Sequence, residues 1–228
     1  MDLGGRVRRK GPTVLNLATA FATLSAIWVA AVWTRQAFMA PRRVLIPDTL
    51  SVANWRDYAS EGIRVGLTDA AVTIVEFIDL GCPFCRKAES YLRDLRGAFP
   101  QEVAVVYRHL PTHGWSLSAA IASQCAADYD VFEAFLHAVF ARGDTVGQST
   151  WTALAAEVGI DNAQSFDACM RDSSTLGAIA RDTLAATVLG VTGTPTFLVN
   201  NLRVRGFPGG EEMNSLVLQA LGASECTR

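Results

Sequence analysis

The sequence predicts an α/β domain that carries a helical insertion and follows an N-terminal membrane helix. The chain of 228 residues is 50% apolar and only 18% charged, with a mean hydropathy of +0.22, which excludes a disordered chain. Part of this apolar content forms one long uncharged stretch near the N-terminus. Beyond it, strand-like and helix-like patterns follow one another in the order β-α-β, several helices, β-β-α, which favours a sheet domain interrupted by helices.

The first predicted element is a membrane helix over residues 13–33, TVLNLATAFATLSAIWVAAVW. A helix of 21 residues is about 30 Å long, which matches the hydrocarbon core of a bilayer. A cleaved signal peptide has a shorter apolar region, about 7–15 residues, so we expect an uncleaved anchor. The preceding tail, residues 1–12, carries a net charge of +3, and fewer basic residues follow the span. This bias favours a cytoplasmic N-terminus and an extracytoplasmic domain on a bacterial-type cytoplasmic membrane.

Residues 34–54 are expected to form a linker, and residues 55–228 a single folded domain. The chain has a net charge of −2, and the part after the tail carries −5. Nucleic-acid binders usually present a basic surface, so we expect no nucleic-acid partner.

The β-branched run 72–78 predicts a buried strand, and residues 82–98 predict a helix with an apolar face at Leu92 and Leu95. A second buried strand is expected at 103–107. The insertion spans about 115–190 and is expected to be helical. One of its helices has an apolar face with helical spacing, formed by Phe132, Phe135, Leu136, Val139 and Phe140. Strands at 196–200 and 202–205 and a helix at 210–221 complete the domain.

The main chemical motif is Cys82-Pro83-Phe84-Cys85, which follows a predicted strand and opens a helix. The unpaired N–H groups and partial positive charge of a helix N-terminus stabilise a thiolate, and proline suits the first helical position. The motif therefore predicts a redox pair, with Cys82 as the exposed nucleophile and Cys85 as the more buried resolving thiol. The alternative is a zinc site, which needs two further ligands. The remaining cysteines are isolated, so we expect neither a metal nor another cofactor.

Two residues far from each other in the sequence support this site. Glu76 lies six positions before Cys82 inside the predicted strand, where a carboxylate is costly unless it is paired or functional. There it could exchange a proton with Cys85 through water; the alternative is an exposed glutamate at a strand end. Pro195 stands before the strand of 196–200, and the Thr194–Pro195 bond is a candidate cis peptide.

The segments VTIVEFIDLGCPFCR at 72–86 and VTGTPTFLV at 191–199 resemble the DsbA-like thioredoxin family. The resemblance extends over about residues 55–221. It implies a thioredoxin fold with an inserted helical domain and a cis Pro195 that faces the redox pair. It also implies that the Thr194 backbone pairs with bound substrate, and it matches Glu76 to the family's buried carboxylate.

The resemblance bears on the remaining cysteines as well. Cysteines at places similar to Cys125 and Cys169 form a structural disulfide in some relatives, and an extracytoplasmic domain would permit one. Two buried free thiols are the alternative, since free cysteine packs as a small apolar residue. Cys226 has no assigned partner.

Phe84 departs from the family pattern, because strongly oxidising members have histidine at that position. A phenyl ring cannot hydrogen-bond to sulfur, so we expect a less favoured thiolate and a less oxidising couple, with Arg86 and Lys87 replacing part of the charge. Phe84, together with Pro83, could contact apolar client segments; the alternative is that the surface simply tolerates it. His113 is expected to be structural rather than catalytic.

These observations predict a membrane-anchored extracytoplasmic thiol–disulfide oxidoreductase that acts as an oxidant on client proteins with cysteines. By family analogy, a quinone-linked membrane protein would reoxidise it. Two alternatives remain open. One is a reductase or isomerase with the same site, supplied with electrons by a membrane protein. The other is a non-catalytic accessory subunit of a membrane complex.

Overall fold

The computed structural model describes Trp28 and residues 50–148 and 150–225. The predicted tail, the anchor at 13–33 apart from Trp28, and most of the linker lie outside these residues. The chain divides into two units, Met1–Arg42 and Arg43–Arg228, and the folded domain belongs to the second. Within the described residues, no helix has both the length and the apolar character needed to cross a membrane.

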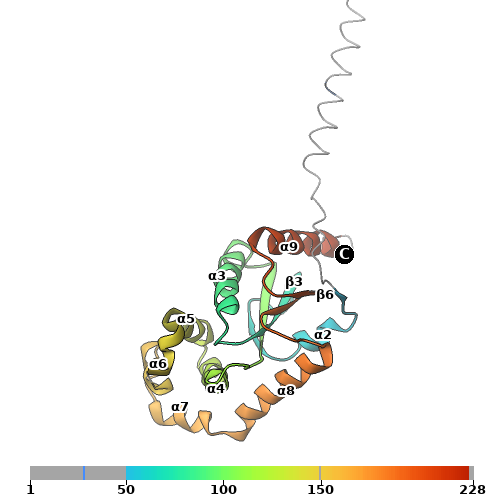
Figure 1. Cartoon of the computed structure of the whole chain (residues 1–228). Helices are drawn as coiled ribbons and strands as arrows, with labels where there is room; N and C mark the ends of the chain where they lie inside the picture. Colours follow the sequence, from blue (N-terminus) through green and yellow to red (C-terminus); the bar gives the residue numbers. More distant parts are fainter. Residues whose placement is uncertain (1–27, 29–49, 149, 226–228) are drawn as a thin grey trace, which may run out of the picture. The chain divides into compact units, whose positions relative to one another are not determined.

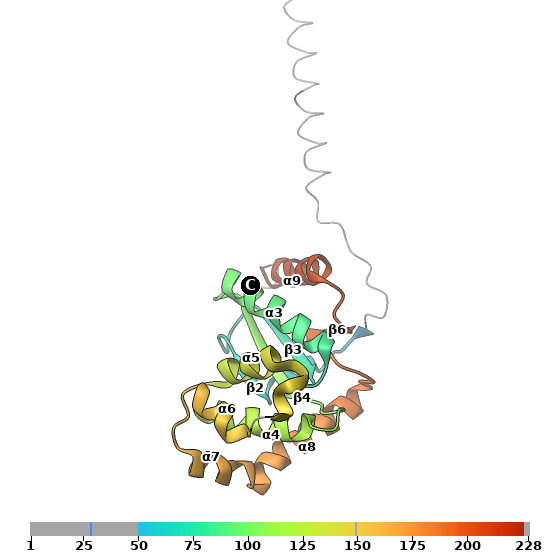
Figure 2. The ribbon, with the colours of Figure 1, turned by 60° about the vertical axis from the view of Figure 1, so that its left-hand side comes forward.

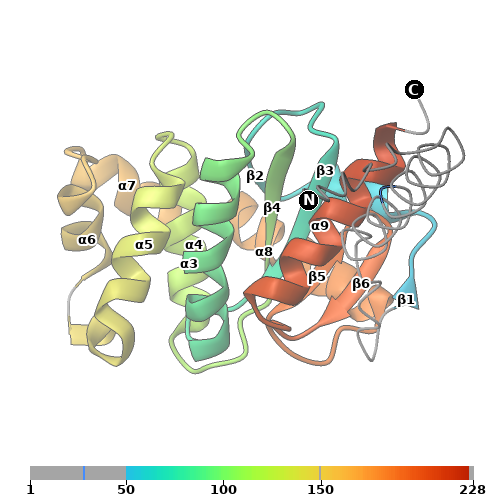
Figure 3. The same ribbon diagram turned by 90° about the horizontal axis from the view of Figure 1, so that it is seen from above.

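One mixed sheet of six strands forms the centre of the domain (Figure 1). The strand order is β1-β6-β5-β3-β4-β2, which can be followed in Figure 3. Strands β3 and β4 are parallel, and every other neighbouring pair is antiparallel. The strands are β1 (Leu50–Ser51), β2 (Ile63–Val65), β3 (Val72–Ile78), β4 (Val103–His109), β5 (Thr196–Val199) and β6 (Leu202–Arg205). The predicted fold class is confirmed: this is a thioredoxin fold with a helical insertion between β4 and β5.

Helices cover both faces of the sheet (Figure 3). On one face, α3 (Pro83–Ala98) and α9 (Gly210–Glu225) pack against β3 through residues such as Ile74, Leu92 and Met213. On the other face, α2 (Trp55–Ala59) and α8 (Ser173–Leu189) pack against the alternate side chains of the same strands. Because β3 is covered on both sides, all seven of its residues are buried, which explains its continuous apolar run.

Most helices of the insertion form a group at one end of the sheet (Figure 2), and its last helix, α8, continues along one face of the sheet. The insertion consists of α4 (Ser116–Ala127), α5 (Phe132–Arg142), a 3₁₀ turn (Gly143–Gln148), α6 (Trp151–Glu157), α7 (Ala163–Met170) and α8. The predicted apolar face of α5 is confirmed, since all five of its residues are buried. A disulfide joins Cys125 of α4 to Cys169 of α7, with Cα atoms 5.9 Å apart.

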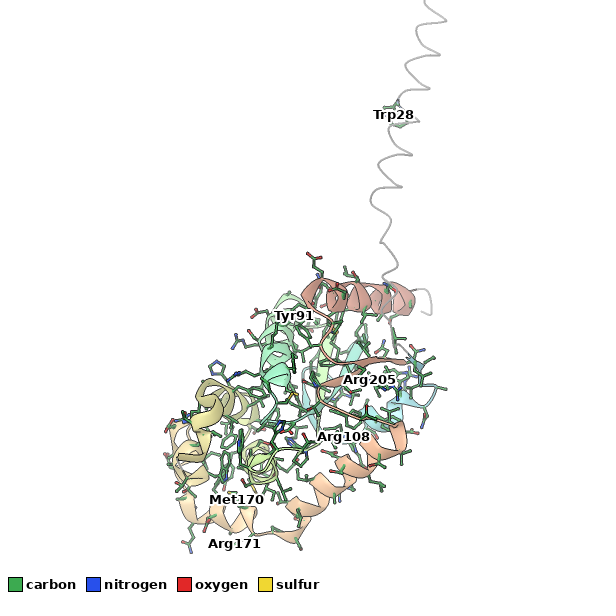
Figure 4. All side chains as sticks on the ribbon, in the orientation of Figure 1. Trp28, Tyr91, Arg108, Met170, Arg171 and Arg205 are labelled. Atoms are coloured by element: carbon green, nitrogen blue, oxygen red, sulfur yellow. A yellow bond between two sulfur atoms is a disulfide. The ribbon has the colours of Figure 1, made fainter. Side chains whose placement is uncertain are left out.

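A buried ion pair attaches α8 to the sheet. The Arg108 side chain, labelled in Figure 4, pairs with Asp182 of α8 and donates to the Tyr58 carbonyl at 3.0 Å. The second Asp182 oxygen accepts the His109 backbone N–H at 2.8 Å. These bonds satisfy a buried guanidinium and a buried carboxylate, so the last helix of the insertion has a fixed place beside β4.

The structure differs from the sequence expectations mainly at the N-terminal side of the domain. Strand β1 lies within the stretch expected to be linker, where Leu50 and Ser51 pair with β6 and Val52 is buried. Strand β2 and helix α2 were not predicted either. Each of these elements has five residues or fewer, which is too short to show a repeating hydrophobic pattern.

One strand boundary also differs from the prediction. Asn200 falls outside β5 and has a positive φ of 48° at the turn into β6.

The Cys125–Cys169 bridge closes a loop of 44 residues, so its removal should destabilise the domain. The double variant Cys125→Ala/Cys169→Ala is expected to lose roughly 2–4 kcal/mol of unfolding free energy, because the unfolded chain gains freedom. Urea denaturation followed by circular dichroism measures this. The alkylation rate of Cys82 is the control and should not change, since the bridge is outside the redox site. An unchanged midpoint would mean that the bridge contributes nothing to stability.

Candidate redox site

Cys82 is placed by the junction of β3 and α3. It is the N-cap residue of α3, with an extended backbone, and Pro83 occupies the first turn as predicted. Its carbonyl accepts the Arg86 N–H at 3.2 Å, the first bond of the helix. Its sulfur lies 3.3 Å from the Thr194 carbonyl oxygen, across the site. The side chain is thus held between the helix N-terminus and the loop before β5.

The Cys82 thiol is strongly acidified, and its pKa is lowered to about 5. The largest cause is a hydrogen bond from the Cys85 thiol; the backbone N–H groups of Cys85 and Phe84 add to it, while burial opposes it. The Phe84 ring is 65% exposed. The absence of a histidine at position 84 therefore does not leave the thiolate unsupported, because donors of the helix turn stabilise it.

The pKa of the Cys85 thiol is shifted in the opposite direction to that of Cys82. Cys85 is fully buried, and its sulfur accepts the Asp79 backbone N–H at 3.5 Å. Burial is the main cause that raises the pKa of the Cys85 thiol, and the hydrogen bond to Cys82 and the charge of Glu76 raise it further. Both cysteines are free thiols and both are buried, Cys82 at 6% exposure and Cys85 at 0%. The prediction of an exposed Cys82 is therefore wrong, because the helix turn and the loop before β5 cover it, while Cys85 is the more buried of the two as predicted. The pair therefore combines one thiolate with one protonated thiol.

Glu76 is completely buried in the centre of β3, opposite Tyr107 of β4 and Phe197 of β5. Among the described residues, neither of its carboxylate oxygens has a hydrogen-bond partner. Burial raises the pKa of Glu76 well above its ordinary value, and the charges of Glu89 and Cys82 act in the same direction. The alternative of an exposed strand-end glutamate is therefore wrong, and the side chain is a buried acid that holds its proton readily.

Asp79 was not identified from the sequence, yet it organises the site. Its buried carboxylate accepts hydrogen bonds from the Gly81 N–H at 2.8 Å, the Thr112 N–H at 2.7 Å and the Thr112 hydroxyl at 2.5 Å. Burial opposes ionisation, but the surrounding donors outweigh it and hold the pKa of Asp79 below its ordinary value. An acidic residue just after a buried strand was the only sequence sign of this role.

His113 approaches the site from the loop after β4. Its Nδ1 lies 2.7 Å from the Asp79 carboxylate, and a Cβ added at Gly81 would lie 3.0 Å from the His113 Cβ. The hydrogen bond to Asp79 is the main cause that raises the pKa of His113, and the charge of Cys82 also contributes. The fold thus brings a histidine near the thiols, which nothing in the sequence indicated.

The loop before β5 completes the site. The Thr194–Pro195 peptide is cis. The Thr196 hydroxyl donates to the Gly193 carbonyl at 2.7 Å, and the Gly206 N–H donates to the Pro195 carbonyl at 2.9 Å. The structure therefore brings Glu76, both motif cysteines and the 194–195 loop together. The Cys125–Cys169 bridge belongs to the insertion, and Cys226 lies outside the described residues.

Across residues 50–148 and 150–225, no cluster of three or more His, Cys, Asp or Glu side chains is arranged to hold a metal ion.

Comparison with known proteins agrees with this geometry. A family model described as "Thioredoxin" matches residues 59–218. A thioredoxin-like oxidoreductase from Silicibacter pomeroyi DSS-3 is 32% identical, with a TM-score of 0.63, over 69% of this chain and 90% of that one. The chain belongs to the thioredoxin family. The thiol–disulfide exchange protein α-DsbA2 from Wolbachia pipientis shares its fold. It is 20% identical, with a TM-score of 0.65, over 73% of this chain and 91% of that one.

The curated relatives that the chain matches are much longer proteins. The Na(+)/H(+) antiporter NhaA of Herminiimonas arsenicoxydans is 36% identical over 141 residues, which are 62% of this chain and 22% of the relative. The other antiporters matched are covered to a similar extent, so the chain spans about a quarter of the length of the curated relatives it matches.

The ionisation of Cys82 leads to a direct test with iodoacetamide. Because the thiolate is the nucleophile and the pKa of Cys82 is about 5, the alkylation rate should stay constant from pH 8 to pH 6 and fall below pH 5. An ordinary thiol loses reactivity below about pH 8.5. Mass spectrometry after proteolysis separates Cys82 from Cys85, which should remain unmodified. A half-maximal rate near pH 8 for Cys82 would contradict the assigned environment.

Proposed function

We propose that this DsbA-like protein is a membrane-anchored oxidant that introduces disulfides into client proteins outside the cytoplasm. The observation that carries the proposal is the contrast between the acidic Cys82 and the buried, protonated Cys85. Stabilising the Cys82 thiolate stabilises the reduced form of the pair, which makes the disulfide form a stronger oxidant. The site therefore favours transfer of the Cys82–Cys85 disulfide to a client protein.

In the proposed reaction, a client thiolate attacks Cys82 in the Cys82–Cys85 disulfide. A mixed disulfide forms between the client and Cys82, and Cys85 leaves as a thiolate that must take up a proton. A second client thiolate then attacks the client sulfur of the mixed disulfide. Cys82 leaves as a stable thiolate, the client is oxidised by two electrons, and the Cys82–Cys85 pair is reduced by two.

Glu76 is proposed to supply the proton that Cys85 requires. It is buried beneath the pair, it interacts electrostatically with both cysteines, and its raised pKa keeps a proton available. When the reaction runs in reverse, the same carboxylate would accept the proton of Cys85 as it attacks a mixed disulfide. The Thr194 backbone and Pro195 stand beside the Cys82 sulfur, where an extended client segment would pair.

The proposed location rests on two features. Residues 13–33 would anchor the domain of residues 55–228 through the linker of 34–54, with the basic tail of 1–12 in the cytoplasm. The Cys125–Cys169 disulfide is the kind of bond that persists in an oxidising compartment. Reoxidation of the pair would then fall to a quinone-linked membrane protein.

A second candidate is a non-catalytic accessory module of a membrane complex. The observation in its favour is that the curated relatives are named as antiporters and that the chain matches only about a quarter of their length. In that case the thioredoxin domain would bind a partner rather than oxidise clients. Against it stands the preserved pair of free thiols with opposite acidity.

The proposed function is tested with the full-length oxidised protein and a reduced, unfolded client. Cys82→Ser should abolish client oxidation, because no mixed disulfide can form. Cys85→Ser, loaded beforehand with glutathione as a mixed disulfide at Cys82, should exchange the glutathione for the client and accumulate the client–Cys82 mixed disulfide, visible on a non-reducing gel. Retention of full oxidation by Cys82→Ser, or an unreactive wild type, would refute the catalytic proposal and leave the accessory role.

The measured reduction potential of the pair separates the oxidant from the reductase that uses the same site. Thioredoxin-fold couples range from about −270 mV for reductants to about −120 mV for oxidants. We expect a value on the oxidising side of about −200 mV. A value close to that of reductants, with the pair mostly reduced in cells, would favour the reductase.

Glu76→Gln tests the proton transfer while preserving side-chain size. Resolution of the mixed disulfide by Cys85 should slow by about two orders of magnitude, as expected for a lost acid–base group, whereas alkylation of Cys82 should change little.

The pH dependence of stability gives a second measurement on Glu76→Gln. An acid with a raised folded pKa loses stability as pH rises above its ordinary value of 4.5. The variant should therefore gain melting temperature over the wild type, and gain more at pH 8 than at pH 5. An equal difference at both pH values would mean that Glu76 is not a perturbed acid.

A further inference from the structure

A groove runs from Cys82 along the side of α3 that faces the insertion. Its first part is a cavity of about 140 Å³ beside the Cys82 sulfur, lined by Arg86, Trp115, Phe140 and Gly143 among others. Its second part is a cavity of about 190 Å³ that shares Arg86 and Phe140 and continues between α3 and α5, past Arg93 and His137. Figure 3 shows α5 alongside α3. We call these two parts the α3–α5 groove. Neither Thr194 nor Pro195 lines it.

Arg86 is the charged residue common to both parts of the groove. Among the described residues, its guanidinium forms no ion pair and no side-chain hydrogen bond. A Cβ added at Gly143 would lie 2.5 Å from the Arg86 Nη1, and Gly143 has a positive φ of 52°. A side chain at position 143 would occupy the space in which the Arg86 guanidinium lies, and glycine leaves that space free.

The carboxylates near the groove do not neutralise Arg86. Among the residues whose side chains the structure describes, no aspartate or glutamate lines the first cavity. In the second, the buried Glu89 accepts a hydrogen bond from the Tyr107 hydroxyl at 2.6 Å, and burial raises its pKa to about 7. Glu133 of α5 is ion-paired with Arg96. The groove thus presents an unpaired guanidinium between the aromatic walls of Trp115 and Phe140.

We propose that the α3–α5 groove binds the client residues next to the reacting cysteine and selects an acidic side chain, above all glutamate. The proposal rests on the oxidoreductase function proposed above. Arg86 lies one helical turn from Cys82, about 6 Å along α3. An extended client advances about 3.3 Å per residue, so a side chain one or two positions from its cysteine reaches the guanidinium.

The chemistry of the groove matches such a side chain. A guanidinium binds a carboxylate through two parallel hydrogen bonds, which gives both affinity and orientation. The Trp115 and Phe140 walls would take the methylene groups of glutamate and exclude water, which strengthens the charge interaction. A lysine at the same client position would face Arg86 directly and be repelled.

The test uses full-length oxidised protein and three peptides that differ only in glutamate, glutamine or lysine beside a single cysteine. The rate of mixed-disulfide formation is measured for each peptide by stopped flow. It is divided by that peptide's rate with oxidised glutathione, which removes the effect of the neighbouring charge on the thiol itself. The normalised rate should be about three- to tenfold higher for glutamate than for glutamine, and lowest for lysine.

Arg86→Gln should abolish this preference, so that its normalised rates with the glutamate and glutamine peptides become equal. Lys87→Gln is the matched control. It removes the same charge from the next residue of α3, which is exposed and lines neither cavity, so it should keep the preference. Arg86→Glu should reverse the preference toward lysine, which a loss of folding could not do.

Three outcomes would overturn the proposal: no preference in the wild type, an equal loss in Lys87→Gln, or a preference that survives Arg86→Gln. An equal loss in both variants would mean that only the general charge near Cys82 matters. Failure of the proposed function is a separate result, because the wild type would then react with none of the three peptides.

Discussion

The buried carboxylate of Asp79 fixes the geometry on which the redox site depends. It accepts hydrogen bonds from the loop after β3, at Gly81, and from the loop after β4, at Thr112 and His113. Its own backbone N–H donates to Cys85, and its carbonyl accepts the Cys82 N–H at 3.0 Å. One residue therefore holds both cysteines and both adjoining loops. Because the carboxylate is saturated with donors, it remains ionised in spite of its burial.

Glu76 shows what the same functional group does without donors. It lies three residues earlier, inside β3, is buried as completely, and has no hydrogen-bond partner among the described residues. The pKa of Glu76 is raised, whereas that of Asp79 is lowered. The two carboxyl groups, one inside β3 and one just after it, therefore have different roles: Asp79 is a structural anion and Glu76 a proton carrier, because N–H and O–H donors reach only Asp79.

Hydrophobic patterns predicted the elements that bury a continuous surface. Strands β3 and β4, helix α3 and the apolar face of α5 follow from their sequences because each must exclude water over several turns or alternations. Strand β1 could not be predicted, since Leu50 and Ser51 are exposed and are a strand only through their pairing with β6. Within the site, the cysteines and Glu76 were predicted because their residue types are unusual in those positions. Asp79 and His113 were not, because their roles arise from contacts across about 30 positions of sequence.

The sequence by itself determined an α/β domain with a helical insertion and the place of a cysteine pair at a helix N-terminus, and its family resemblance implied the thioredoxin fold. These depend on local order: an apolar strand, a proline at the first turn and the spacing of two thiols. Only the tertiary structure decided that a hydrogen bond from Cys85 acidifies Cys82, that Glu76 is a buried acid without hydrogen-bond partners among the described residues, and that Arg86 lies in a groove where no described side chain pairs with it. The reason is physical: ionisation and recognition depend on burial and on donors brought together from β3, β4, α3 and α5, and no single segment contains that information.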